Sequence, residues 1–178
     1  MVEQDFSATT DQDFSNYQPI KMWKRLSLDQ RQAVAESFWN DDQSTDQQVE
    51  AIAAIASRMK FRTKSVLALP LEKRVRYLST LPSISDSIVA RALVAYHLER
   101  QRPMMSAFLD ALGIKHEDGL IAEEEAPKPD AEAVKKAATE LTAKFPADEV
   151  SLYFSTLVSQ DPETWGVLAD KTVVSIQS

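Results

Sequence analysis

Apolar residues recur at helical spacing along most of the chain. From residue 27 onward they fall three and four positions apart, which places them on one face of a helix. The first helix is expected to begin at Ser27. Ser27 and Gln30 have the spacing of a capping box, in which two side chains satisfy free amide groups at a helix start. Further helix starts are expected at Ser44 to Asp46, at Pro70, at Ser85 or Asp86, and after Pro103.

The second of these helices shows how a core face is assigned from the pattern. Its apolar positions are Val49, Ile52, Ala53, Ala56 and Met59, which follow one another at helical spacing. All five are therefore predicted to face the core. Each of the other helices has a similar stripe, and the helix after Pro103 is expected to end at a glycine, residue 113.

A break in the pattern separates these helices from a second group. Three glutamates at residues 123–125 are followed within four positions by two prolines, a composition typical of a linker. Beyond it, apolar stripes run from Val134 to Phe145 and from Val150 to Val158, and a short helix is expected to begin at Asp161. Residues 172–176 are mostly β-branched and are expected to be extended.

The pattern predicts an all-α fold: an irregular helical bundle of about seven to eight helices. Only three glycines occur in 178 residues, too few for the turns of a β-sandwich or barrel. Residues 77–81 (Tyr-Leu-Ser-Thr-Leu) and 153–157 (Tyr-Phe-Ser-Thr-Leu) resemble each other, and each follows a similar helix start. A degenerate helical-hairpin array is therefore an alternative to the irregular bundle.

Four segments are predicted along the chain. Residues 1–19 are polar and acidic without a helical period, which predicts a flexible N-terminal arm. A main helical domain is expected over residues 20–122, and an acidic, proline-containing linker over residues 123–130. Residues 131–178 are expected to form a helical hairpin that packs on the main domain, since so short a unit has too little core to be stable alone.

The net charge is −7, and the charged residues are distributed unevenly along the chain. Residues 51–102 hold ten Lys/Arg against three Asp/Glu, whereas both flanks are acidic. Within this basic centre, a set of cations surrounds an aromatic residue, Phe61. Such interleaving suits a phosphate backbone, but an acidic partner within the chain or a helix dipole would also account for it. The set comprises Arg58, Lys60, Arg62, Lys64, Lys73, Arg74 and Arg76.

The arm contains a short duplication, Gln-Asp-Phe-Ser at residues 4–7 and again at residues 12–15. Each copy sets one aromatic residue, Phe6 or Phe14, among polar and acidic groups, as in a peptide that docks into a pocket of a partner protein. The alternatives are chance similarity and an arm that lays Phe6, Phe14 and Tyr17 on its own domain. Met104 and Met105 are a second candidate for partner binding, as an adaptable apolar patch, although such a stripe is more typical of a core.

The residue content excludes several kinds of chemistry. The absence of cysteine excludes disulfides, thiolate metal sites and cysteine nucleophiles. The glycines lack the spacing of a phosphate-binding loop, and no G-x-S-x-G motif occurs, so no cofactor is expected. No stretch approaches the ~20 apolar residues of a membrane span, and no signal peptide is visible, which favours a cytoplasmic setting.

The two histidines, His97 and His116, are the only weak candidates for a metal site. They lie 19 residues apart and would need carboxylates to complete a coordination shell. The alternative is an ordinary helical histidine and a solvated polar loop.

These observations favour a non-catalytic helical module that binds another protein or acts as a scaffold. The first alternative is a regulator that binds nucleic acid or another polyanion through residues 58–76. The second is an unrecognised metal-dependent or serine hydrolase. The identity of the partner and the oligomeric state do not follow from the sequence.

Overall fold

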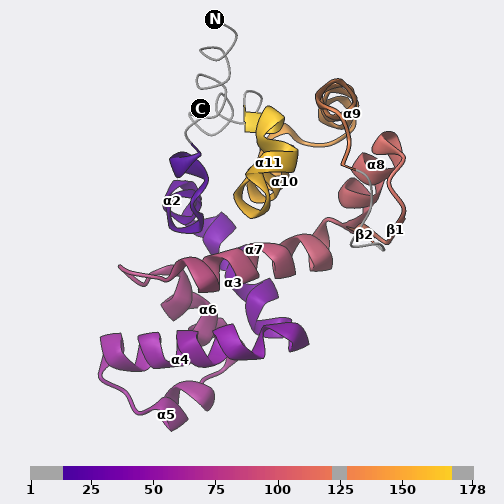
Figure 1. Ribbon diagram of the computed structural model, residues 1–178. Helices are drawn as coiled ribbons and strands as arrows, with labels where there is room; N and C mark the ends of the chain where they lie inside the picture. The colour runs from indigo at the N-terminus through magenta and orange to yellow at the C-terminus, as the bar shows by residue number, and fades with distance from the viewer. Residues whose placement is uncertain (1–13, 122–127, 170–178) are drawn as a thin grey trace, which may run out of the picture.

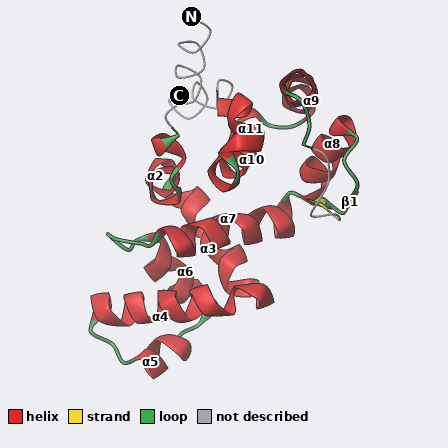
Figure 2. Ribbon diagram, in the orientation of Figure 1, coloured by secondary structure: helices red, strands yellow, loops and turns green. Residues whose placement is uncertain are grey.

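The computed structural model describes residues 14–121 and 128–169, which form an all-α helical bundle with one small hairpin (Figures 1 and 2). In the first part of the chain the helices are α2 (Pro19–Arg25), α3 (Leu28–Asn40), α4 (Thr45–Met59), α5 (Thr63–Leu67), α6 (Leu71–Ser79) and α7 (Asp86–Arg100). The later helices are α8 (Arg102–Leu112), α9 (Ala131–Lys144), α10 (Ala147–Gln160) and α11 (Pro162–Trp165). Three 3₁₀ turns, η1 (Ser15–Tyr17), η2 (Asp42–Ser44) and η3 (Gly166–Leu168), complete the helical content of the described residues.

Local hydrogen bonds explain why the predicted helices begin and end where they do. The capping box is confirmed: Ser27 Oγ accepts from the Gln30 amide at 3.1 Å, and Gln30 Oε1 accepts from the Ser27 amide at 2.9 Å. Ser85 caps α7 by accepting from the Ile88 amide at 3.2 Å. At the end of α8, Gly113 takes the left-handed conformation expected of a C-terminal glycine, with φ of +70°.

Several short elements were not predicted from the pattern. Helices α2 and α5 have seven and five residues, too few to show a repeated apolar stripe. The hairpin joins β1 (His116–Glu117) to antiparallel β2 (Leu120–Ile121). Its two turn residues, Asp118 and Gly119, both have positive φ, at 49° and 90°. An Asp-Gly pair is the strongest short-range sign of such a turn, so the sequence contained a usable signal for this hairpin.

A first hydrophobic core joins helices α2 to α7. Helix α3 packs against both α6 and α7, while α4 and α5 close the lower end of the molecule in the view of Figure 1. The loop between α3 and α4 is tied to α7 through Arg91, whose guanidinium contacts Asp41 Oδ2 and Ser44 Oγ, both at 2.9 Å. The largest fully buried side chains of this core are Phe38, Ile55, Leu78, Ile88, Leu93, Val34, Val66 and Val89.

A second core is formed by α8 to α11, with Tyr17 added from the start of the described chain. Helix α8 packs mainly on α9, and its buried residues belong to this second core. The predicted main domain, residues 20–122, therefore contains a helix that shares its core with the C-terminal helices. Its apolar face is covered by α9 and α10 because the fold brings those helices, rather than α3 to α6, against it.

Helix α10 links the two cores. Leu152 is buried in the first core, although the other buried apolar residues of α10 lie in the second. Glu149 at the start of α10 accepts hydrogen bonds from Tyr96 Oη at 3.0 Å and from Gln101 Nε2 at 3.0 Å, both near the end of α7. The C-terminal helices thus pack on the preceding ones through an apolar residue and a polar cluster one turn apart.

The described end of the predicted arm, residues 14–19, is part of the fold. Tyr17 is buried in the second core, and Phe14 packs against that core from its edge. The Ile20 amide donates to Asp86 Oδ1 at 2.8 Å, which ties the beginning of α2 to the start of α7. A flexible arm ending at residue 19 is therefore wrong for residues 14–19, because aromatic side chains there contribute to a core. The remainder of the arm lies outside the described residues.

Candidate functional site

The most unusual surface of the described chain is the end formed by α4, α5, the loop between them and α6, called the basic–apolar end below. Six of the seven predicted cations are exposed there. None of the six takes part in an ion pair found among residues 14–121 and 128–169. The six are Arg58, Lys60, Arg62, Lys64, Lys73 and Arg76. This end therefore carries positive charge that the described part of the fold does not neutralise.

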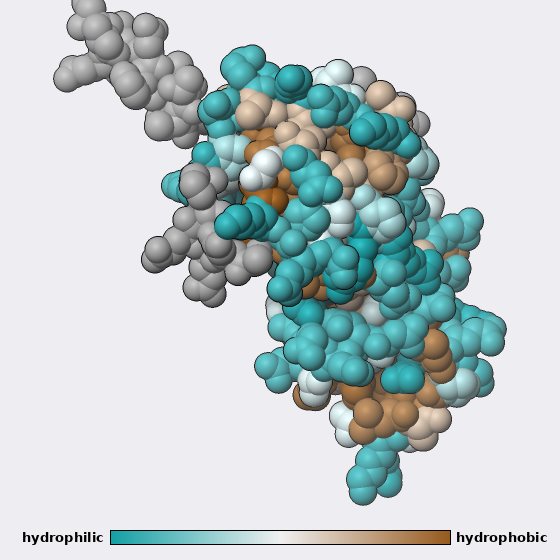
Figure 3. All heavy atoms as spheres, turned by 90° about the vertical axis from the view of Figure 1, so that its right-hand side faces the viewer, coloured by the Kyte–Doolittle hydropathy of each residue, from teal (hydrophilic) through white to brown (hydrophobic). Residues whose placement is uncertain are grey.

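Large apolar side chains are exposed on the same end. Val49 is 62% exposed, Met59 37%, Phe61 40% and Leu67 59%. Figure 3 shows brown apolar atoms gathered at the lower end of the face it displays, at the height where Figure 1 places α4 and α5. Contiguous apolar surface rimmed by polar residues is a common mark of an interaction site.

The exposure of Val49 and Met59 corrects the core face predicted for α4. The residues that α4 buries are Ala51, Ile52, Ile55 and Ala56, so the buried stripe is narrower than the apolar one. Ala53 is also exposed. Helix α4 contacts α5, α6 and α7, and these neighbours cover only the middle of its apolar stripe.

The loop between α4 and α5 is held in a defined conformation. The Phe61 ring packs edge-to-face on Tyr77 of α6, with ring centroids 6.1 Å apart. The Phe61 amide also donates to the Ala56 carbonyl oxygen at 2.9 Å, closing the end of α4. Lys60 between them adopts the left-handed conformation, with φ of 57°. The cations on either side of Phe61 thus flank a residue that is held both by its ring and by its amide.

Arg74 differs from the other predicted cations. Its guanidinium lies over the Trp39 ring, 5.2 Å from the ring centroid, and its Nε is buried. The side chain is half-buried between α6 and α3. Such a contact stabilises packing between helices, so Arg74 belongs to the fold more than to the charged surface.

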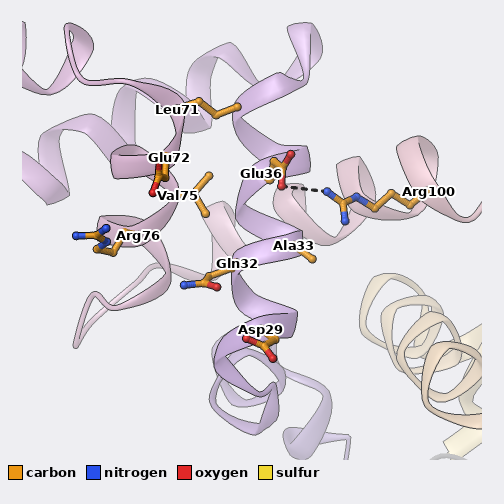
Figure 4. A pocket seen from close by; sticks show the side chains of 9 residues that line it. All are labelled: Asp29, Gln32, Ala33, Glu36, Leu71, Glu72, Val75, Arg76 and Arg100. Carbon is orange, nitrogen blue, oxygen red and sulfur yellow. Dashed lines mark ion pairs between the residues drawn. The ribbon is translucent and has the colours of Figure 1, made fainter.

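A groove between α3 and α6 borders the basic–apolar end (Figure 4). Its volume is about 540 Å³, and Arg76 and Glu72 of α6 line one side of it. Across the groove, Glu36 of α3 forms an ion pair of 3.3 Å with Arg100 of α7, drawn as a dashed line in Figure 4. Three acidic and two basic side chains line the groove, so it has no strong preference for one sign of charge.

The two methionines proposed as an apolar patch lie inside the second core. Met104 is fully buried and Met105 nearly so, alongside Phe108 of the same helix. A partner-binding surface built on this pair is therefore wrong, and the core alternative describes them. The fold decides this because both side chains are buried in the second core, where Met105 lies against Gly119 of the hairpin.

The two copies of the duplicated arm motif have different positions relative to the described residues. Phe14 packs edge-to-face against Tyr17, with ring centroids 6.4 Å apart, and contacts Gly166, where a Cβ atom would meet the Phe14 ring at 2.8 Å. Phe14 thus lies on its own domain, as one alternative proposed. Phe6 lies outside the described residues.

The structure does not assemble a metal site from the two histidines. The Nδ1 atom of His97 lies 2.8 Å from the Leu93 carbonyl oxygen on the same helix, and the ring is buried between Tyr96 and Tyr153. Burial lowers the pKa of His97 to about 4. His116 Nε2 lies 2.7 Å from Asp110 Oδ1, and its Nδ1 accepts from the Gly119 amide at 3.1 Å. Across residues 14–121 and 128–169, no three His, Asp or Glu side chains gather closely enough to hold a metal ion.

None of the helices in the described ranges is long and apolar enough to cross a bilayer. No protein-family model, curated protein or solved structure matches this chain.

Proposed function

We propose that the chain is a helical protein-binding module, and that its basic–apolar end takes an acidic segment of a partner protein. One observation carries the proposal: exposed cations that form no ion pair with a described residue and exposed large apolar side chains occupy the same end of the molecule. A partner segment that offers carboxylates together with a few apolar side chains complements both features. Charge complementarity of this kind mainly provides specificity and fast association, whereas the apolar contacts provide affinity.

The backbone at Lys60 supports the proposal. A residue with a Cβ atom is disfavoured in the left-handed conformation by roughly 1 kcal/mol relative to glycine, and helices usually end on glycine at this position. Lys60 nevertheless occupies it, with φ of 57°. A cation kept where glycine would be more stable is consistent with a role on the surface, since local strain is often retained at functional positions.

Nucleic acid is the alternative ligand for the basic–apolar end. Cations that surround an aromatic residue, here Phe61, also suit a phosphate backbone and its bases. The net charge of −7 disfavours it, since the acidic remainder of the chain repels a polyanion at long range. Apolar side chains such as Val49 and Leu67, 62% and 59% exposed, also find no counterpart on a phosphate backbone. A protein segment satisfies both the apolar and the charged groups.

The proposal can be tested by site-specific photo-cross-linking in the cells that produce the chain. Phe61 is replaced by p-benzoylphenylalanine in the full chain, and adducts are mapped by mass spectrometry to the cross-linked peptide. We expect a protein adduct whose cross-linked segment is rich in Asp and Glu. The same probe at Lys136, exposed on α9, serves as the control position and should not give this adduct.

Charge reversal decides whether such an adduct depends on the basic–apolar end. Combining Arg62→Glu, Lys64→Glu and Lys73→Glu should abolish it. A matched triple reversal elsewhere (Lys24→Glu, Lys136→Glu and Lys144→Glu) should preserve it, because those lysines are also exposed and have no ion pair among the described contacts. An adduct that survives the first triple reversal, or no adduct at position 61, would overturn the proposal. An adduct with nucleic acid would replace it with the polyanion-binding alternative.

A further inference from the structure

We propose that the surface that holds Phe14 is a binding site for the sequence Gln-Asp-Phe-Ser, and that residues 4–7 are a second ligand for it. This surface, called the Phe14 site below, is formed by Gly166 and Tyr17 at the edge of the second core. Phe14, from the copy of the motif at residues 12–15, occupies it in the structure. The Phe14 site shares no residue with the basic–apolar end, so the two surfaces can be tested separately.

Gly166 makes room for the aromatic ring. A Cβ atom on this residue would lie 2.8 Å from Phe14 Cζ, closer than such atoms normally approach. The backbone at residue 166 is right-handed helical, with φ of −55°, so its conformation does not require glycine. The absence of a side chain therefore matters for the contact with the ring and not for the backbone.

Phe14 can leave this site without disturbing the residues that follow it. Phe14 is half-buried, whereas Tyr17, against which it packs, is 4% exposed. Tyr17 Oη is held by the Ala169 carbonyl oxygen at 3.1 Å, and Arg25 Nη1 donates to the Asn16 carbonyl oxygen at 3.2 Å. Neither contact involves residue 14. The place of the Phe14 ring is thus accessible to another aromatic ring while Asn16 and Tyr17 stay in position.

The first copy of the motif has the sequence and the reach to take this place. Phe6 has the same neighbours as Phe14, with Gln and Asp before it and Ser after it. Phe6 lies 11 positions before Tyr17, and Phe14 lies three positions before it. Because the entropy cost of loop closure rises slowly with length, the longer connection disfavours Phe6 by only roughly tenfold. Phe14 therefore occupies the site in most molecules, and Phe6 replaces it when Phe14 is absent.

A double-mutant cycle in the full chain tests this exchange. Urea unfolding gives the equilibrium constant of unfolding for Phe6→Ala, Phe14→Ala and the double variant. Phe6→Ala alone should leave this constant unchanged, since Phe14 still fills the site. In the Phe14→Ala background, Phe6→Ala should raise the constant by about two- to fivefold, because the second ring is then lost as well. Equal effects of Phe6→Ala in the two backgrounds would overturn the proposal.

A second measurement follows the Phe6 ring directly. The full chain is labelled with 4-fluorophenylalanine, and the Phe6 signal in the ¹⁹F NMR spectrum is identified by its loss in Phe6→Ala. In Phe14→Ala, this signal should move toward the position that the Phe14 signal has in the unaltered chain. Adding Gly166→Ala, whose Cβ atom takes up space that the ring needs, should reverse the shift.

Three outcomes of this measurement contradict the exchange. The Phe6 signal does not move in Phe14→Ala, or its shift persists when Gly166→Ala is added. The third is a shift that grows with protein concentration, because residues 4–7 would then bind to a second chain and not to their own.

Discussion

The Tyr17 hydroxyl donates a hydrogen bond of 3.1 Å to the backbone carbonyl oxygen of Ala169, 152 positions further along the chain. Both residues are buried in the second core. The contact joins the two ends of the described chain, so the second core is complete only when residues near the N-terminus have docked on η3. This explains why a truncation of residues 1–19 would remove part of a core, whereas removal of residues 1–13 would leave these contacts in place.

The first prediction concerns this hydrogen bond. Tyr17→Phe keeps the ring in the core but leaves the buried carbonyl without this donor, which should lower the free energy of unfolding by about 1–3 kcal/mol. Tyr77→Phe is the matched control, since the hydroxyl of this half-buried residue has no hydrogen bond to any residue within 14–121 or 128–169. Urea unfolding followed by circular dichroism measures both. Equal stability of the two variants would contradict a structural role for the Tyr17 hydroxyl.

The second prediction separates stability from binding at Lys60. Lys60→Gly relieves the left-handed conformation and should raise the free energy of unfolding by roughly 0.5–1 kcal/mol. The same change removes one cation from the basic–apolar end and should weaken cross-linking from position 61. Thermal unfolding and the cross-linking yield are measured on the same preparations. A stabilised variant that cross-links as well as the unaltered chain would show that Lys60 is not part of the binding surface.

The third prediction distinguishes two neighbouring cations on α6. Arg74→Ala removes the guanidinium that lies over Trp39 and should lower the free energy of unfolding by about 1 kcal/mol. Lys73→Ala removes an exposed side chain and should change it by less than about 0.5 kcal/mol. Chemical denaturation of the two variants provides the comparison. A neutral Arg74→Ala would mean that the contact with Trp39 contributes little to folding.

The fourth prediction is a dependence of stability on pH that arises from His97. Burial lowers its pKa from 6.5 to about 4, so between these values the unfolded chain binds a proton that the folded chain does not. The unfolding free energy should therefore fall as pH drops from about 6.5 to 4, by up to about 3 kcal/mol from this group. Denaturation midpoints in this range should depend less on pH in His97→Phe than in the unaltered chain, and an equal dependence in the two proteins would contradict a neutral, buried His97.

The fifth prediction compares two glycines that both have positive φ. The Cβ atom of Gly113→Ala would meet no atom within 4 Å, so only the strain of a positive φ opposes the substitution. This strain should lower the free energy of unfolding by about 1 kcal/mol. Gly119→Ala would also place its Cβ 2.7 Å from Met105 Cβ, an atom attached directly to the α8 backbone. Gly119→Ala should therefore lower the free energy of unfolding by about 1–3 kcal/mol more than Gly113→Ala, because α8 or the hairpin must shift. Thermal unfolding of both variants isolates this difference, and equal losses would contradict close packing of the hairpin on α8.

Helix positions were largely predictable from the sequence because caps and apolar spacing act locally. The capping box at Ser27 and the left-handed glycine at residue 113 are formed by neighbours in the chain, and both occur as expected. The short elements were missed because five to seven residues do not show a helical period, as in α5. The candidate site was predictable only in part. The cations could be found by counting charges, but the exposure of Val49 and Leu67 depends on which neighbours the fold provides.

Helices with apolar faces, and a basic centre between acidic flanks, can be derived from the order of the residues. Those properties depend on residue type and spacing alone. Which of the apolar faces are covered depends instead on how the helices pack in the fold. The fold buried Met104 and Met105 in the second core, joined Tyr17 to the same core, whose other members lie 87 to 152 positions later, and left Val49 exposed on α4. The physical reason is that burial is set by contacts between elements distant in the chain, and an apolar stripe does not specify the element that will cover it.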